Sequence, residues 1–276
     1  MAKEKITIVG AGLVGSLLSI YLAKRGYGVE LYERRPDPRE KCKEGTVGEG
    51  RSINLAISAR GLNALEKIGL DQKVRDLAIP MHGRRMHDQA GQITYQEYGK
   101  DSSQYINSIS RGWLNCYLLD QAEATGQVEI FFNHNLQSVD LERKTAEYQL
   151  ADESRTSIAY GKLIGTDGSS SAARQTLQDK LGIENHADYL SHGYKEFVMS
   201  AKEGGGFKID KNALHIWPRG PFMMIALPNF DGSYTCTLFL AHKSLGPNTM
   251  SFEDLTSKEE VRSFFERKCF AINFFT

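Results

Sequence analysis

Residues 5–33 read KITIVGAGLVGSLLSIYLAKRGYGVELYE and hold the clearest pattern in the chain. Lys5–Gly10 is a short apolar run rich in β-branched residues, which predicts a buried strand. Leu13–Arg25 places apolar residues on one helical face and ends before Gly26, a typical residue at a helix C-terminus. Val29–Glu33 predicts a second strand. The segment therefore predicts a strand–helix–strand unit of an α/β protein.

A glycine motif lies between the first strand and the helix. Gly10, Gly12 and Gly15 fit the GxGxxG pattern that binds the pyrophosphate of a dinucleotide. The glycines permit a tight turn and close approach of a phosphate, while the helix N-terminus offers free N–H groups. Glu33, which ends the second strand, is expected to accept hydrogen bonds from an adenosine ribose. The motif suits both NAD and FAD, and the acid argues against a 2′-phosphate in the same site.

The composition is that of an ordinary globular protein. The chain has 276 residues, of which 41% are hydrophobic and 25% charged, and this length suggests one or two domains. Lys+Arg and Asp+Glu both number 34, and this balance argues against a nucleic-acid partner. The apolar stretch near the N-terminus is interrupted by glycines, so we expect no targeting or membrane segment.

The four cysteines are scattered along the chain, at Cys42, Cys116, Cys236 and Cys269. No two of them have CxxC or zinc-ligand spacing, so we expect no metal site. We expect reduced thiols and a cytoplasmic location, as is usual for a chain of this size.

A second motif, GTDGSSSAAR at residues 165–174, lies between an apolar strand and a helix. Alone it is consistent with an ordinary turn and helix start, since Ser and Asp cap helices. From about residue 188 the chain becomes rich in β-strand patterns separated by Gly, Pro and Asn turns. We therefore expect a Rossmann-like dinucleotide-binding domain over residues 1–180, interrupted by a β insertion near 80–105, and a β-sheet domain over 181–276.

Together the two motifs resemble those of the flavin-dependent aromatic hydroxylases, the para-hydroxybenzoate hydroxylase-like flavoproteins. The second motif is similar to their GADGxxSxxR motif, and Ser110-Arg111 resembles their flavin-contacting arginine at a helix start. Within this group, RSINLA (51–56), LHIWPR (214–219) and FMMIALPN (222–229) are similar to the kynurenine 3-monooxygenase family. The resemblance runs from residue 5 to about residue 268.

The resemblance implies an α/β fold with a Rossmann-like FAD-binding domain and an antiparallel β-sheet substrate domain. It implies a monooxygenase that uses FAD, consumes NADPH and O2, and hydroxylates L-kynurenine to 3-hydroxy-L-kynurenine. No protein nucleophile and no metal are required, because the cofactor carries the chemistry. The residues that the resemblance places at FAD are Gly10, Gly12, Leu13, Val14, Gly15, Glu33, Arg34, Ala56, Arg111, Leu136, Asp167 and Gly168.

The resemblance also implies a substrate site on the β-sheet domain. Arg84 and Tyr98 match positions that hold the substrate carboxylate, and a guanidinium can bind a carboxylate through two parallel hydrogen bonds. Without the resemblance, Arg84 would be interpreted as a solvated strand residue. The residues that match the apolar wall over the aromatic ring are Leu214, Ile225, Leu227 and Phe239, which ordinary core packing would also explain.

The chain departs from the family pattern at its C-terminal end. The family is longer, and its GDAAH segment for the flavin ribityl chain and its PFFGQGMN loop do not occur in these 276 residues. We therefore expect a truncated chain that lacks the C-terminal helical part. Three alternatives stay open: a flavin hydroxylase of another aromatic acid, a catalytically impaired FAD-binding fragment, and an NAD-dependent dehydrogenase.

Overall fold

The computed structural model describes residues 4–41, 54–101, 103–246 and 249–267. The chain divides into two compact units, residues 1–43 with 112–187 (unit 1) and residues 44–111 with 188–276 (unit 2). Residues 44–111 thus group with the C-terminal strands, whereas we expected only a short β insertion to leave the first domain. The regrouping follows from strand pairing, because β5 (Gly83–His87) lies beside β14 (Ala213–Pro218) in one sheet.

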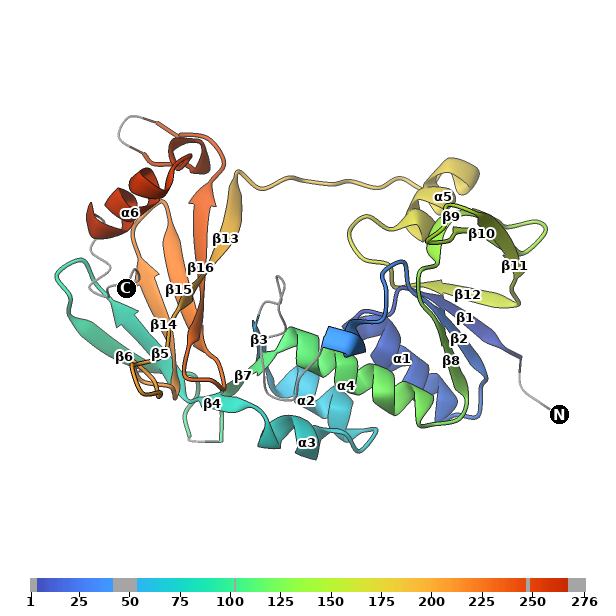
Figure 1. Cartoon of the computed structure of the whole chain (residues 1–276), viewed down its shortest axis with the longest axis horizontal. Coiled ribbons are helices and arrows are strands. Elements are labelled where there is room, and N and C mark those ends of the chain that lie inside the picture. The colour runs from blue at the N-terminus through green and yellow to red at the C-terminus, as the bar shows by residue number, and fades with distance from the viewer. Residues whose placement is uncertain (1–3, 42–53, 102, 247–248, 268–276) are drawn as a thin grey trace. The chain divides into compact units, whose positions relative to one another are not determined.

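Unit 1 contains the expected strand–helix–strand segment. Its parallel sheet has the strand order β12 (Lys162–Gly165), β1 (Ile6–Val9), β2 (Val29–Tyr32) and β8 (Val128–Phe131). Helix α1 (Leu13–Ala23) packs against β1, β2 and β8 (Figure 1). The loop between β1 and α1 is therefore at the carboxyl end of the sheet, where open α/β sheets bind ligands.

A second, antiparallel sheet covers part of unit 1. It consists of β9 (Asn135–Asp140), β10 (Thr145–Gln149) and β11 (Arg155–Ala159). Tyr148 of β10 is fully buried and stacks on Tyr32 at a centroid distance of 4.7 Å. Helix α5 (Ala172–Leu181) packs against β9.

The long helix α4 (Arg111–Glu123) buries its apolar residues and carries one of the four cysteines, Cys116. Cys116 is disulfide-bonded, so the expectation that every cysteine is a reduced thiol is wrong. Cys236 of unit 2 is free and buried.

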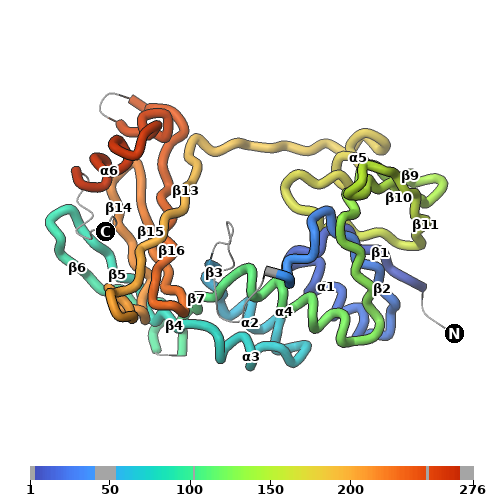
Figure 2. The backbone as a smooth tube through the Cα atoms, viewed as in Figure 1, coloured from blue at the N-terminus to red at the C-terminus, as the bar shows by residue number. Residues whose placement is uncertain are grey.

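Unit 2 contains two sheets. The smaller consists of β3 (Asn54–Ile57), β7 (Ile106–Ser110) and β4 (Ile79–Met81), next to helices α2 (Ala59–Glu66) and α3 (Asp71–Asp76). The larger has six strands in the order β13 (His192–Met199), β16 (Tyr234–Ala241), β15 (Met223–Pro228), β14, β5 and β6 (Ile93–Glu97) (Figure 2). This sheet is antiparallel as expected, except that β5 and β14 run parallel.

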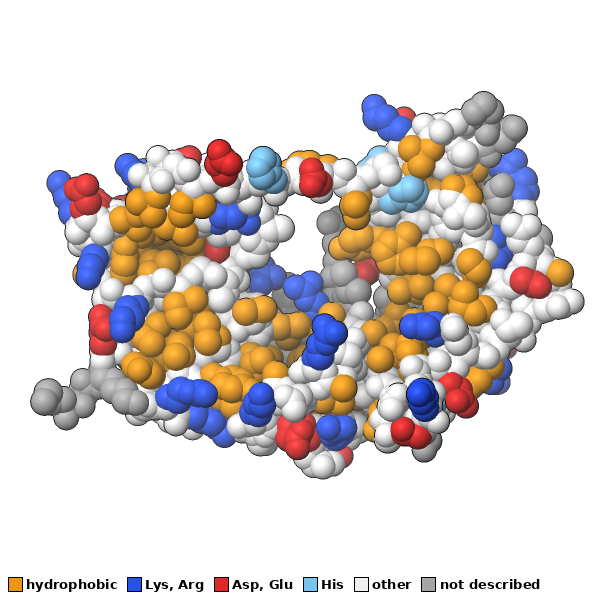
Figure 3. Space-filling model, turned by 180° about the vertical axis from the view of Figure 1, so that it is seen from behind, with side chains coloured by type: hydrophobic (Ala, Val, Ile, Leu, Met, Phe, Trp, Pro, Cys, Tyr) orange, Lys and Arg blue, Asp and Glu red, His pale blue; other side chains and the backbone are white. Residues whose placement is uncertain are grey.

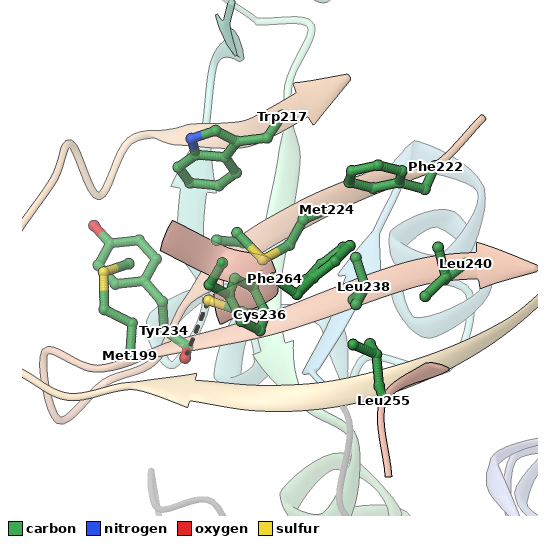
Figure 4. Close-up of a cluster of buried hydrophobic side chains, with 12 residues drawn as sticks. Met199, Trp217, Phe222, Met224, Tyr234, Cys236, Leu238, Leu240, Leu255 and Phe264 are labelled. Carbon is green, nitrogen blue, oxygen red and sulfur yellow. Dashed lines mark hydrogen bonds between the residues drawn. The ribbon is translucent and has the colours of Figure 1, made fainter. Parts of the chain in front are cut away.

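One face of the six-stranded sheet forms the core of unit 2 under helix α6 (Lys258–Arg267). Figure 4 shows Trp217, Met224 and Leu238 pointing into the same buried cluster as Phe264 of α6. Phe264 is fully buried and lies against Phe222 at a centroid distance of 5.2 Å. Because successive strand residues alternate between faces, the residues between these core positions lie on the opposite face of the sheet.

Two buried histidines join β5 to β14 on the core face. His87 Nε2 lies 2.8 Å from His215 Nδ1, and His215 Nε2 lies 2.8 Å from the Asp210 carbonyl oxygen. A carbonyl only accepts, so His215 carries its proton on Nε2 and His87 donates to His215 Nδ1. Burial lowers the pKa of His87 to about 4, with the charges of His215, Arg219 and Arg85 acting in the same direction. Burial also lowers the pKa of His215.

We expect this pair to make unit 2 acid-sensitive. Since the folded pKa of His87 lies below the unfolded value of 6.5, stability is full above pH 6.5 and falls as the pH drops towards 4. The loss between pH 7 and 4.5 amounts to about 2–3 kcal/mol for His87 alone. Urea unfolding at a series of pH values measures it, and His87→Gln flattens the dependence by that amount. His82→Gln, an exposed neighbour, keeps the wild-type slope; equal slopes for all three proteins contradict the assignment.

Candidate functional site

The glycine loop of unit 1 is held in a conformation that its glycines make possible. Gly10 has φ +100°, and a Cβ there would lie 2.6 Å from the Thr166 carbonyl oxygen. A Cβ on Gly15 would overlap the Gly10 carbonyl oxygen. Gly12 differs, because a Cβ there would meet no atom within 4 Å. Gly10 and Gly15 are thus required by packing, while Gly12 borders open space.

That open space lies at the N-terminus of α1. Gly12 is the N-cap residue, no side chain caps the helix, and its first turn contains no acidic residue. The positive end of the helix dipole and its free N–H groups are therefore left for an anion. Val14 in the first turn is 67% exposed, which is unusual for an apolar residue and suits a surface that a ligand covers. These features fit the pyrophosphate of FAD.

Glu33 follows β2 and holds the glycine loop in place. Its Oε2 accepts a hydrogen bond from the Ala11 N–H at 2.9 Å, and its Oε1 accepts from Arg35 N at 3.0 Å and Arg35 Nε at 2.7 Å. Burial alone would raise the pKa of Glu33, but the hydrogen bonds and charge of Arg35 lower it overall. Glu33 is thus an ionised anchor of the loop, and its hydrogen bond to a ribose stays a prediction. Arg34 beside it is exposed.

The second motif lies directly against the glycine loop. Thr166 Oγ1 donates to the carbonyl oxygens of Val9 and Gly10, at 2.9 and 2.7 Å. Asp167 accepts from Ser171 Oγ at 2.6 Å and from the Ala173 N–H at 3.2 Å, so its carboxylate stabilises the start of α5. The two motifs, about 150 residues apart in sequence, therefore form one loop cluster.

The remaining predicted FAD residues are placed in different ways. Gly168 has φ +83°, which suits the turn before α5. Leu136 is only 6% exposed and its side chain belongs to the core of unit 1. Ala56 is exposed on β3, and Arg111 is the exposed first residue of α4, so both belong to unit 2. Residues 51–53 of the RSINLA segment lie outside the described residues.

The predicted substrate residues share one face of the six-stranded sheet. Strand register pairs Arg84 with Leu214, Ile216 with Ile225, and Met223 with Phe239. With the alternation along each strand, this places Leu214, Ile225, Leu227, Phe239 and Arg84 on the face opposite α6. Three apolar side chains of this face are exposed at the surface, namely Tyr194 (57%), Val198 (64%) and Met223 (40%). In the view of Figure 3, hydrophobic side chains form wide areas on each unit.

Arg84 and Tyr98 lie in contact at one end of this face. The Arg84 guanidinium carbon lies 4.5 Å from the centre of the Tyr98 ring, a cation–π contact. The Tyr98 hydroxyl is buried and has no hydrogen-bond partner. Burial raises the pKa of Tyr98, with the Arg84 charge acting against it, so the phenol keeps its proton at neutral pH. The phenol O–H has no partner, and the guanidinium has N–H groups besides the one that donates to Gln96, so both side chains can donate to a carboxylate.

The spacing of the strands gives the separation between Arg84 and the predicted apolar wall. Neighbouring strands lie about 4.8 Å apart, so Ile225, two strands from Arg84, is about 10 Å away across the sheet. Leu214 is on the adjacent strand and Phe239 is three strands away. Of the predicted wall residues, Leu214 and Ile225 are therefore nearer to Arg84 across the sheet than Phe239 is.

Two residues that hold the glycine loop were not singled out from the sequence. Asn115 of α4 donates from Nδ2 to the Ala11 carbonyl oxygen at 3.0 Å, and Thr166 bonds to Val9 and Gly10 as described above. Asn115 lies four residues after Arg111, on the same helical face, and this spacing was an available signal. Thr166 stands inside the GTDG string but was not assigned a role.

The fold and the glycine-loop cluster agree with the family that the sequence matches. Residues 3–221 match the family described as FAD binding domain. This match covers more than half of the chain, and the chain therefore belongs to that family, whose cofactor is FAD.

The curated relatives are similar to this chain over most of its length and share one name. The chain is 51% identical over 266 residues to a kynurenine 3-monooxygenase of Myxococcus xanthus, covering 95% of this chain and 55% of the relative. It is 44% identical over 266 residues to the Flavobacterium psychrophilum enzyme of the same name, covering 95% of the chain and 56% of the relative. The chain thus spans about half the length of the curated relatives it matches.

Solved structures support the fold. A PqsL variant from Pseudomonas aeruginosa superposes with a TM-score of 0.70 at 18% identity, covering 96% of this chain and 67% of that one. The p-nitrophenol 4-monooxygenase PnpA from Pseudomonas putida superposes with a TM-score of 0.68 at 17% identity, covering 96% and 62%. Among the described residues, no helix has the length and apolar character to cross a bilayer.

Proposed function

We propose that the protein is an FAD-dependent, NADPH-consuming monooxygenase that converts L-kynurenine to 3-hydroxy-L-kynurenine with O2. One observation carries the proposal, namely that the Arg84 guanidinium lies 4.5 Å from the Tyr98 ring centre, beside a phenol without a hydrogen-bond partner, at the end of an apolar sheet face. The 51% identity to a kynurenine 3-monooxygenase supports the choice of substrate. We also propose a cytoplasmic location.

In this proposal, unit 1 binds the dinucleotide and unit 2 binds the substrate. Gly12 and the α1 N-terminus receive the pyrophosphate, and Glu33, Asn115 and Thr166 keep the loop in shape. Bound FAD would supply the redox and O2 chemistry that side chains lack. Arg84 and Tyr98 orient the substrate through its carboxylate, and the apolar wall keeps water from its ring.

The test is NADPH oxidation by the purified chain with FAD present. We expect L-kynurenine to stimulate oxidation and 3-hydroxy-L-kynurenine to appear on chromatography. Stimulated oxidation that yields only hydrogen peroxide, or a different aromatic acid as the better substrate, contradicts the proposed reaction.

A second candidate is an FAD-binding chain without turnover. It is favoured by the coverage of only 55% of the Myxococcus xanthus relative. Flavin binding together with an oxidation rate that kynurenine does not change is the outcome that selects it.

A further inference from the structure

Arg84 and Arg85 of β5 both lie near a tyrosine ring, but only Arg85 forms an ion pair with an acid among the described residues. Arg85 lies 5.5 Å from the Tyr95 ring centre and forms an ion pair with Asp210 at 2.7 Å on the core side of the sheet. Arg84 lies 4.5 Å from the Tyr98 ring centre on the opposite face. Both arginines are half-buried residues whose guanidinium carbon lies near a tyrosine ring. Their polar partners differ in charge.

The polar neighbour of Arg84 is an amide rather than an acid. Gln96 is its cross-strand partner in the β5–β6 hairpin, and Arg84 Nη1 donates to Gln96 Oε1 over a long 3.4 Å. Directly opposed residues of an antiparallel pair hold their side chains on the same face within contact distance. Among the described residues, Arg84 has no ion pair with an acid. The neutral Gln96 amide therefore orients the Arg84 guanidinium without balancing its positive charge.

We propose that Gln96 is the specificity-determining residue of this site, because its neutral amide orients Arg84 yet leaves its charge free for a substrate carboxylate. An acid at the same place would occupy the guanidinium, as Asp210 occupies that of Arg85. The inference rests on the proposed function, in which Arg84 binds the carboxylate. It adds that the residue opposite Arg84 selects acidic over non-acidic ligands.

The substitution Gln96→Glu tests this directly. Gln96 is exposed on an edge strand, so the variant is expected to fold as the wild type does. Thr94→Glu is the matched control, because Thr94 lies on the same face of β6, two residues away, and opposite Met86. Gln96→Met removes the hydrogen bond at nearly equal volume without adding charge. Circular dichroism and thermal unfolding verify that all variants are folded.

The readout is ligand binding by saturation-transfer NMR titration of the whole chain with two ligands. One is L-kynurenine and the other is kynuramine, which has the same ring and amine but no carboxylate. We expect Gln96→Glu to weaken kynurenine binding about tenfold or more and to leave kynuramine binding unchanged or tighter. Thr94→Glu stays within about threefold of wild type for both. Gln96→Met weakens kynurenine several-fold and spares kynuramine.

If Gln96 had only a structural role, its substitution would weaken the binding of both ligands by the same factor. Equal losses of affinity for L-kynurenine and kynuramine therefore overturn the inference. Unchanged kynurenine binding in Gln96→Glu overturns it as well. Benzoate, an aromatic carboxylate, separates this inference from the proposed function. If wild type binds benzoate but not kynurenine, the proposed substrate fails, and benzoate binding by Gln96→Glu decides the inference. If wild type binds neither ligand, both proposals fail.

Discussion

Arg84→Met lowers the affinity of the chain for L-kynurenine about 100-fold or more. Arg84 donates the charge-assisted hydrogen bonds of the proposed anion site, and truncating such a partner leaves a carboxylate unpaired on an apolar face. Methionine removes the guanidinium that lies over the Tyr98 ring but keeps an unbranched apolar side chain on a half-buried strand position, so we expect the fold to be retained. NMR or calorimetric titration of folded protein measures the effect.

Arg85→Met is the matched control for this result. It removes the same group from the next residue of β5, on the opposite face and away from the apolar wall. We expect Arg85→Met to change kynurenine affinity less than about threefold while lowering stability slightly through the loss of the Asp210 ion pair. Equal losses of affinity in the two variants contradict the assignment of the substrate face.

Gly12→Ala weakens FAD binding roughly 10- to 100-fold with little effect on stability, whereas Gly15→Ala strongly destabilises unit 1. The new Cβ at residue 12 meets no protein atom, but it occupies the space next to the α1 N-terminus that the pyrophosphate requires. Filling that space costs about 1–3 kcal/mol of binding, or roughly 10- to 100-fold in affinity. The Cβ at residue 15 overlaps the Gly10 carbonyl and costs about 3 kcal/mol or more of stability.

The contrast between the two glycines is the informative result. Flavin fluorescence titration measures affinity, and urea unfolding measures stability. Gly168→Ala is a comparison for stability alone, because its positive φ strains the backbone while a Cβ there meets no atom within 4 Å. If Gly12→Ala binds FAD like the wild type, the dinucleotide does not use this loop.

The sequence predicted the parts of the fold that depend on local pattern. The unit β1–α1–β2 was predicted because its apolar periodicity and glycines act within thirty residues of one another. The parallel pairing of β5 with β14 was missed, because strands about 130 residues apart leave no local signal of their register. The boundary of unit 2 was missed for the same reason.

In the candidate site, too, the sequence predicted residues that have a local motif and missed contacts that depend on the folded geometry. Glu33 was predicted from its spacing after the glycine motif, but its hydrogen bonds to Ala11 and Arg35 depend on loop geometry that the sequence does not reveal. Arg84 was predicted through a resemblance, and its role stays a prediction. Gln96 was not found, since its role depends on the cross-strand register of the β5–β6 hairpin. Leu136 was predicted at FAD, and the structure buries it in the core of unit 1 at 6% exposure.

The most direct test is the visible absorption spectrum of the purified 276-residue chain, after incubation with FAD and removal of free flavin by gel filtration. We predict a retained flavin band at about one FAD per chain, which Gly12→Ala loses. The contrary result is a chain that has the circular dichroism spectrum of a folded protein but elutes without flavin. It would show that the glycine loop, Glu33 and the Thr166 turn do not form a sufficient FAD site.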